Sequence, residues 1–352
     1  MMKKHLLYFL TASIILAACS KKNDPAPDPP TPEPPTTNIP TPPTRTPWVA
    51  GTFKIVAYMP SYKDPATVDD SKYKMITHLL YAFINPNTSG DGSLNTVLQP
   101  NRFSAVIAKA KNFGVKTGIS VSGDKNIFAT IAASATARTK FTAQLLAFVK
   151  TNNLDGADID WEYPTTLDAS ASNFVLLMQE LSIALHAEGK FLSAAVTPGV
   201  YAGNIKNGIK PEVFPYIDFL NIMQYDGPNY DTAEPLNHAS MKLTEKSLDV
   251  YLIEKGLPKE KAILGIPLYG ENSAGSALAY RDIEASGANV YLNLTTINGN
   301  GYGYNGIELI WKKAQLAKER ANGIMFWEFS FDSNSSKSLI RAANDQLGRP
   351  YN

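Results

Sequence analysis

The sequence of 352 residues contains one cysteine, Cys19, so no disulfide can form within the chain. Histidine is almost as scarce, with four copies, and one of these, His5, lies at the very start of the chain. So few histidines leave little with which to build a catalytic metal centre. We therefore expect neither a metal nor a cofactor.

The sequence also lacks an excess of charge of either sign. It has 33 lysines and arginines against 32 aspartates and glutamates, which gives a formal net charge of +1. This balance does not indicate binding to nucleic acid or to a charged polymer, and it favours a neutral partner. Aromatic residues make up 10% of the chain, a content that suits stacking on sugars but equally suits an ordinary core.

No hydrophobic run near the N-terminus is long enough to span a membrane. The apolar run at 6–18 follows Lys3 and Lys4, and it is too short to cross about 30 Å of hydrocarbon, so it predicts a signal peptide at 1–19. Its last residues, LAAC, resemble the bacterial lipobox, in which the cysteine, here Cys19, is acylated. The alternative is an ordinary signal peptide with an incidental cysteine. In the lipoproteins that this segment resembles, an aspartate after the cysteine indicates the inner membrane, so the resemblance, with Ser20 here, implies an outer-membrane anchor.

Residues 20–47 are rich in proline and threonine, and from Asp24 onward almost every second residue is proline. Such a segment has no apolar periodicity, and we expect a disordered, semi-rigid linker of about 3.1 Å per residue. A proline-rich recognition ligand is the alternative. The linker would hold the folded part away from the membrane, which the protein would contact only through its lipid anchor.

The remaining segment, 48–352, has the length of a single α/β barrel. Short apolar runs alternate with amphipathic segments, which predicts parallel strands joined by helices. The expected strands are 53–58, 75–84, 115–121, 154–162, 191–197, 217–225, 262–268 and 324–329, and expected helices include 138–150, 172–188, 242–255 and 307–320. Eight such units favour a TIM barrel, with a doubly wound open sheet as the alternative.

One predicted strand carries three carboxylates, in the segment LDGADIDWEYP at 154–164. Successive side chains of a strand point to opposite faces, so Asp158, Asp160 and Glu162 share one face, and Ile159 and Trp161 share the other. In a barrel we expect the acids to point inward. Glu162 then lies at the carboxyl end of the strand, where TIM-barrel enzymes place their chemistry.

Clustered acids inside a barrel cannot all be ionised, so we expect at least one raised pKa, as a general acid requires. A solvent-facing strand would also alternate, but the apolar residues of the segment argue against it. A site for a divalent cation is the other alternative, since carboxylates bind hard cations. The scarcity of histidine disfavours metal catalysis. Of the remaining histidines, we expect His78 to be a hydrogen-bonded core residue and His186 to lie on a helix surface.

The segment DGADIDWE at 155–162 resembles the DGxDxDxE signature of glycoside hydrolase family 18, the chitinases and their relatives. Further segments resemble the second, sixth, seventh and eighth strands of this family: 76–83, 223–226, 264–270 and 323–328. The resemblance implies a TIM barrel and a retaining mechanism in which the 2-acetamido group of the substrate is the nucleophile.

The same resemblance implies roles for individual residues. Glu162 would protonate the glycosidic oxygen, Asp160 would orient the acetamido N–H, and Tyr225 would hold the acetamido oxygen. Asp158 would exchange a hydrogen bond with Asp160. The other implied site residues are Tyr58 and Ser120, which would support Asp158, Trp327, which would form the floor beneath the sugar, and Phe83, Met223 and Asp226, which would line the same subsite.

Two features depart from the family pattern. The third-strand motif, usually SxGG, is SVSG at 120–123, so the loop that it shapes is expected to differ. Only about fifty residues separate Gly270 from Gly323, too few for the α+β insertion domain of many relatives. We therefore expect a barrel without a full insertion domain and a shallow, endo-acting groove.

These patterns predict a monomeric exported enzyme that cleaves β-1,4-linked N-acetylglucosamine polymers through an oxazolinium intermediate. One alternative is an endo-β-N-acetylglucosaminidase acting on the chitobiose core of N-glycans, which uses the same acid and acetamido chemistry. Another is a non-catalytic, lectin-like lipoprotein that binds chitin. Such lectins usually lack the glutamate that this chain retains as Glu162.

Overall fold

The structure is a computed structural model that describes Pro40 and residues 53–351. The predicted signal peptide, the lipidation site Cys19 and nearly all of the proline-rich linker lie outside the described residues. Among the residues described, no helix is both long enough and apolar enough to cross a membrane.

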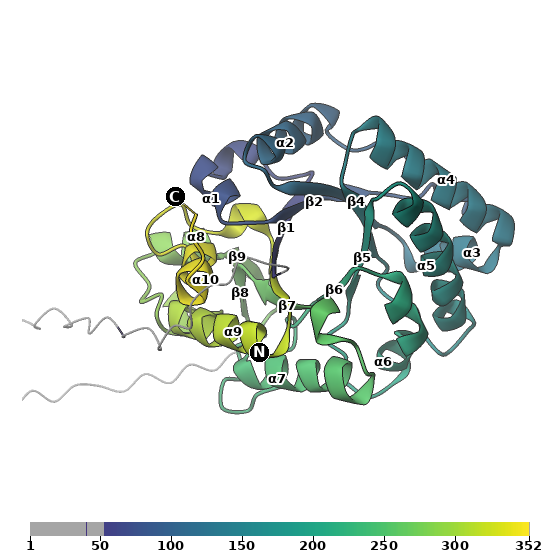
Figure 1. Ribbon diagram of the computed structural model, residues 1–352. Helices are drawn as coiled ribbons and strands as arrows, with labels where there is room; N and C mark the ends of the chain where they lie inside the picture. The colour runs from purple at the N-terminus through teal and green to yellow at the C-terminus, as the bar shows by residue number, and fades with distance from the viewer. Residues whose placement is uncertain (1–39, 41–52, 352) are drawn as a thin grey trace, which may run out of the picture. The chain divides into compact units, whose positions relative to one another are not determined.

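Eight parallel strands close into a barrel in the order β1-β12-β7-β6-β5-β4-β3-β2 (Figure 1). This confirms the predicted TIM barrel and excludes the open sheet, because β1 pairs with both β2 and β12. The strands are β1 Lys54–Pro60, β2 His78–Ile84, β3 Lys116–Ser122, β4 Gly156–Asp160, β5 Phe191–Val196, β6 Phe219–Ile222, β7 Ala262–Pro267 and β12 Gly323–Trp327.

Helices occupy the connections between the strands and surround the barrel (Figure 1). The α-helices are α1 Asp70–Lys74, α2 Pro100–Asn112, α3 Lys125–Ala133, α4 Ala135–Thr151, α5 Ser170–Ala187, α6 Asn204–Gly208, α7 Met241–Leu248, α8 Tyr280–Ala285, α9 Ile307–Arg320 and α10 Leu339–Leu347. Five further helical segments, which are not α-helical, complete the described part: η1 Pro65–Thr67, η2 Pro211–Tyr216, η3 Asp249–Glu254, η4 Lys259–Lys261 and η5 Phe329–Phe331.

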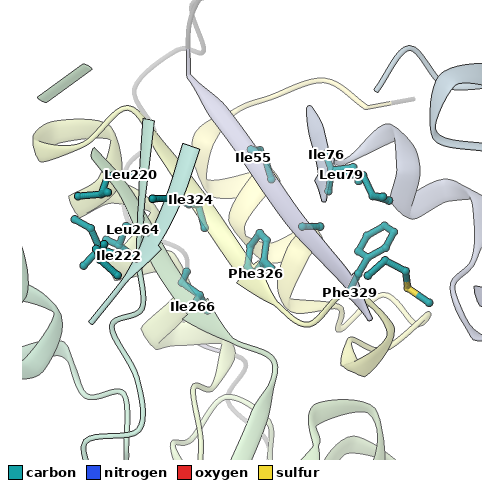
Figure 2. Close-up of a cluster of buried hydrophobic side chains, with 14 of the residues drawn as sticks. Ile55, Ile76, Leu79, Leu220, Ile222, Leu264, Ile266, Ile324, Phe326 and Phe329 are labelled. Atoms are coloured by element: carbon teal, nitrogen blue, oxygen red, sulfur yellow. The ribbon is translucent and has the colours of Figure 1, made fainter. Parts of the chain in front are cut away.

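Alternation along the strands divides the apolar residues between two cores. In β1, Ile55 and Ala57 pack outward against the helices, whereas Val56 and Tyr58 point into the barrel. Figure 2 shows part of the outer core, with side chains such as Ile324 contributed by the barrel strands. The inner core is smaller, which leaves room for polar side chains inside the barrel.

Strand β4 is shorter than the predicted 154–162. Its ladder with β3 ends where Asp160 lies opposite Ser122, the last residue of β3, so Glu162 lies just beyond the strand. The predicted alternation nevertheless holds at Trp161, which is 2% exposed and stacks on Phe128 with ring centroids 5.5 Å apart. Trp161 is a packing residue, as predicted.

The connection between β7 and β12 contains a small antiparallel sheet in place of a full insertion domain, as predicted. Its order is β10-β11-β8-β9, and α8 lies within the same connection. The strands are β8 Tyr269–Asn272, β9 Ala277–Ala279, β10 Leu294–Ile297 and β11 Asn300–Gly303. Strand β8 follows β7 almost directly, so this sheet begins beside the carboxyl ends of the barrel strands.

Candidate active site

Asp158 lies at the centre of a hydrogen-bond network inside the barrel. It is fully buried, and its two carboxylate oxygens accept hydrogen bonds from Tyr58 Oη (2.9 Å), Ser120 Oγ (2.7 Å), Ser193 Oγ (2.6 Å) and Asn221 Nδ2 (3.3 Å). Burial raises the pKa of Asp158, and these four hydrogen bonds oppose that rise. The network therefore holds Asp158 in one orientation below the other acids.

Two members of this network, Ser193 and Asn221, were missed in the sequence. Strand pairing places Ser120 and Ser193 opposite Asp158, one on each side, and this register cannot be read from one strand alone. The sequence did contain a signal for both, because each is a polar residue within an otherwise apolar strand: Ser193 in FLSAAV at 191–196 and Asn221 in FLNI at 219–222.

Asp160 points into the barrel two residues further along β4. It is 5% exposed, and its Oδ1 atom has no hydrogen-bond partner. Burial raises its pKa well above the usual range, and the charges of Glu162 and Asp158 add to the rise. The hydrogen bond expected between Asp158 and Asp160 stays a prediction; among the described residues, the side chains of four other residues donate to Asp158. Asp160 is thus a buried carboxyl group with an unused oxygen.

Glu162 follows β4 at the carboxyl end of the barrel and is exposed to the cavity there. Desolvation raises its pKa; a hydrogen bond with Tyr163 opposes the rise, and the negative charge of Asp226 adds to it. A carboxyl group with a raised pKa on the wall of an accessible cavity has the properties of a general acid.

A cavity of about 340 Å³ opens above the two upper acids and is lined by both Asp160 and Glu162. Its wall brings together nearly all of the remaining predicted site residues: Tyr58, Phe83, Met223, Tyr225, Asp226 and Trp327. Ser120 is not part of the wall, because it lies beneath the cavity with Asp158. Tyr163 and Tyr201 also line the cavity and were missed, since both lie in loops, where no periodicity indicates direction.

Aromatic rings form one side of the cavity. The half-buried Trp327 ring stacks on Phe83, with centroids 5.8 Å apart and planes 22° apart, and contacts Tyr58 edge-on at 5.7 Å. These contacts fix the plane of the indole at the end of β12. A ring held in this way offers an apolar surface on which the face of a sugar can stack.

One further cluster beside the cavity combines Asp226, His238 and Glu271, whose side-chain oxygen and nitrogen atoms lie within 4.8 Å of one another. It does not suit a metal ion, because both ring nitrogens of His238 are occupied. Nδ1 accepts a hydrogen bond from the Asp226 N–H at 3.1 Å, and Nε2 faces the Tyr269 carbonyl oxygen at 3.3 Å. The cluster is therefore a hydrogen-bonded part of the wall.

The structure confirms the environments predicted for His78 and His186. His78 is 8% exposed, and its Nδ1 lies 2.8 Å from Thr77 Oγ1. His186 lies exposed on α5, 2.9 Å from Asp218 Oδ2.

The sequence matches the family description "Glycosyl hydrolases family 18" over residues 54–332, which covers most of the chain. The chain belongs to this family. It is therefore an enzyme, a glycoside hydrolase, and family 18 accounts for the whole barrel, not for the β4 motif alone.

Curated relatives of this family 18 enzyme extend over most of its length. A class V chitinase of Arabidopsis thaliana is 28% identical over 340 residues, which cover 82% of this chain and 87% of that protein. Endochitinase 1 of Metarhizium robertsii is 26% identical over 353 residues, covering 80% of this chain and 81% of that protein.

Solved structures share the fold. A chitinase from Bacteroides thetaiotaomicron superposes with a TM-score of 0.73 at 24% identity, covering 84% of this chain and 96% of that one. A variant chitinase from Cycas revoluta, solved in complex with (GlcNAc)4, gives the same TM-score and identity and covers 84% of this chain and all of the other.

Proposed function

We propose that this enzyme is a retaining chitinase that cleaves β-1,4-linked N-acetylglucosamine chains with the acetamido group of the substrate as the nucleophile. The observation that carries the proposal is the placement of Asp160 and Glu162 on one cavity wall, with Asp160 Oδ1 unpartnered. An unpartnered buried oxygen costs free energy in the empty site, and a bound N–H group removes that cost. The 2-acetamido N–H supplies such a donor.

The mechanism follows from the differences between the three acids. Glu162, with its raised pKa, donates a proton to the glycosidic oxygen while the acetamido carbonyl attacks the anomeric carbon. Asp160 accepts a hydrogen bond from the acetamido N–H and stabilises the positive charge of the oxazolinium intermediate. Glu162, now ionised, then takes a proton from the water that opens this ring.

The remaining wall residues position the sugar. Tyr225 is buried, lines the cavity and donates toward the acetamido oxygen in this proposal. Trp327, which stacks on Phe83, forms the floor beneath the pyranose ring. Asp158 holds the base of the site through Tyr58 and Ser120. The bound oligosaccharides in relatives such as the Cycas revoluta chitinase support this choice of substrate class.

The proposed function is tested by the products from chitotetraose and from a high-mannose glycopeptide, with the first released anomer determined by NMR. We expect cleavage of chitotetraose with direct release of the β-anomer. Direct release of the α-anomer would exclude the retaining route. Cleavage of the glycopeptide alone would assign the enzyme to the endo-β-N-acetylglucosaminidases, and binding of both without cleavage would identify a lectin.

Asp160→Asn is expected to lower activity and raise stability at once. The pKa of Asp160 is raised in the folded state. Protonated Asp160 therefore contributes fully to stability below its unfolded-state pKa, and this contribution is lost as the pH rises through its folded-state pKa. A neutral amide avoids this loss. At neutral pH we expect a free energy of unfolding higher by about 0.5–2 kcal/mol and a kcat lower by about 100-fold.

Urea unfolding at pH 4 and pH 8, together with kcat on chitotetraose, measures both effects. The gain in stability should be larger at pH 8, because Asp160 is protonated in the native protein at low pH. Asp155→Asn is a control at the amino end of β4. An Asp160→Asn variant with wild-type kcat would remove Asp160 from the mechanism.

We also propose that the enzyme is exported and anchored in the outer membrane by a lipid on Cys19, the only cysteine. The proposal rests on the N-terminal sequence. In cells labelled with radioactive palmitate, we expect label on the full-length protein and none on Cys19→Ala. Equal label on both proteins, or on neither, would contradict lipidation at Cys19.

A further inference from the structure

Asp226 reaches the cavity from an unusual backbone conformation. It lies just after β6 with a φ of 58°, in the left-handed region that side-chain-bearing residues seldom adopt. Its side chain lines the cavity and accepts a hydrogen bond from the hydroxyl group of Tyr269. Residues held in such conformations persist only where surrounding groups fix them.

His238 supplies much of that restraint. Its fully buried ring accepts a hydrogen bond from the Asp226 N–H at Nδ1 (3.1 Å), and its main-chain carbonyl accepts one from the Gly227 N–H (2.8 Å). A single residue thus accepts hydrogen bonds from the N–H groups of both Asp226 and Gly227. The ring also lies against Tyr269, with centroids 4.8 Å apart.

These contacts also fix the tautomer of His238. Nε2 faces the Tyr269 carbonyl oxygen at 3.3 Å, and since a carbonyl oxygen can only accept, this contact assigns a proton to Nε2. Nδ1 accepts from the Asp226 N–H at 3.1 Å and also lies 3.3 Å from Asp226 Oδ1. The same imidazole therefore connects the chain after β6 with Tyr269, the first residue of β8, whose hydroxyl group donates a hydrogen bond to Asp226.

We propose that His238, as its Nε2-protonated tautomer, is a positioning residue that aims the Asp226 carboxylate at the catalytic cavity and thereby supports the action of Glu162. The proposal rests on the proposed function, because it assigns Glu162 as the proton donor. His238 does not line the cavity and so acts through Asp226.

The link to Glu162 is electrostatic. The groups that face Glu162 are Asp160 on β4, the adjacent Tyr163, and Tyr225 and Asp226 after β6. The charge of Asp226 contributes to the raised pKa of Glu162, so movement of that carboxylate away from the cavity lowers this pKa. A lower pKa leaves less of the proton donor at neutral pH.

The test compares His238→Ala with His238→Asn, whose amide oxygen can replace Nδ1 as the acceptor. For His238→Ala we expect a kcat about 100-fold lower and an alkaline limb of kcat/KM shifted to lower pH. His238→Asn should restore most of the kcat and return the alkaline limb of kcat/KM most of the way to its wild-type pH. His186→Ala, which removes an exposed histidine on α5, serves as the control and should match the wild type.

Wild-type kcat and an unshifted alkaline limb in His238→Ala would overturn the proposal. So would a His238→Asn variant that folds but is no better than His238→Ala. If neither variant folds, the 15N–1H NMR spectrum of the wild-type histidine rings decides: a proton on Nε2 of His238 supports the proposal, and one on Nδ1 overturns it. A wild-type protein that does not cleave chitotetraose would contradict the proposed function, while this NMR test would remain valid.

Discussion

Replacement of Glu162 by glutamine is expected to abolish hydrolysis and leave oligosaccharide binding intact. Glutamine has the shape of a protonated glutamate but cannot release a proton, so the glycosidic oxygen leaves without protonation. General acid–base catalysis typically contributes about 10²- to 10⁴-fold, and we expect kcat on chitotetraose to fall within or beyond this range. The dissociation constant of chitotetraose, measured by calorimetry, should change little, because the cavity keeps its shape.

The matched control is Glu212→Gln, which makes the same chemical change at an exposed position in η2. It should have the wild-type rate and affinity. Unchanged turnover in Glu162→Gln would remove Glu162 from the mechanism. A loss of binding equal to the loss of rate would show that Glu162 holds the substrate and does not transfer a proton.

Among the proposed substitutions, replacement of Lys72 by alanine is expected to cause the largest loss in the free energy of unfolding. Lys72 and Asp332 form an ion pair of 2.5 Å in which both side chains are almost fully buried. Asp332 also accepts hydrogen bonds from Ser338 Oγ and from the N–H groups of Leu339 and Ile340 at the start of α10. The pair therefore connects α1 with the C-terminal helix.

Removal of Lys72 leaves the Asp332 carboxylate buried without its cation. Breaking a buried pair in this way costs about 3–5 kcal/mol, and we expect this loss in the free energy of unfolding measured in urea. Lys109→Ala is the control, because its pair with Asp70 is largely exposed and worth at most about 1 kcal/mol. Equal small losses in both variants would show that α10 is held by its apolar contacts alone.

The fold was largely predictable because strand and helix periodicities are local properties of the chain. All eight predicted barrel strands are present, with boundaries that differ by up to about three residues. The boundaries were harder to predict, since pairing decides them: β6 is only Phe219–Ile222, although the apolar pattern continues to Tyr225. Trp161 was placed correctly because alternation continues by one residue beyond the end of β4.

The active site was only partly predictable, since its members come from several strands. The motif at 155–162 identified Asp160 and Glu162 through their spacing and family resemblance. It could not show that Ser193 and Asn221 donate to Asp158, because that depends on the register between strands. The hydrogen bond expected between Asp158 and Asp160 stays a prediction, and the four donors to Asp158 were visible only in the structure.

The sequence by itself determined the alternation of strand and helix, the face of β4 that carries the acids, and the limited length of the insertion. Tertiary structure alone decided how β6 and β8 bring Asp226, His238 and Tyr269 together, and which carboxyl oxygen remains unpartnered. The physical reason is that side-chain direction follows from local backbone geometry, whereas hydrogen-bond partners and desolvation depend on groups far apart in the chain.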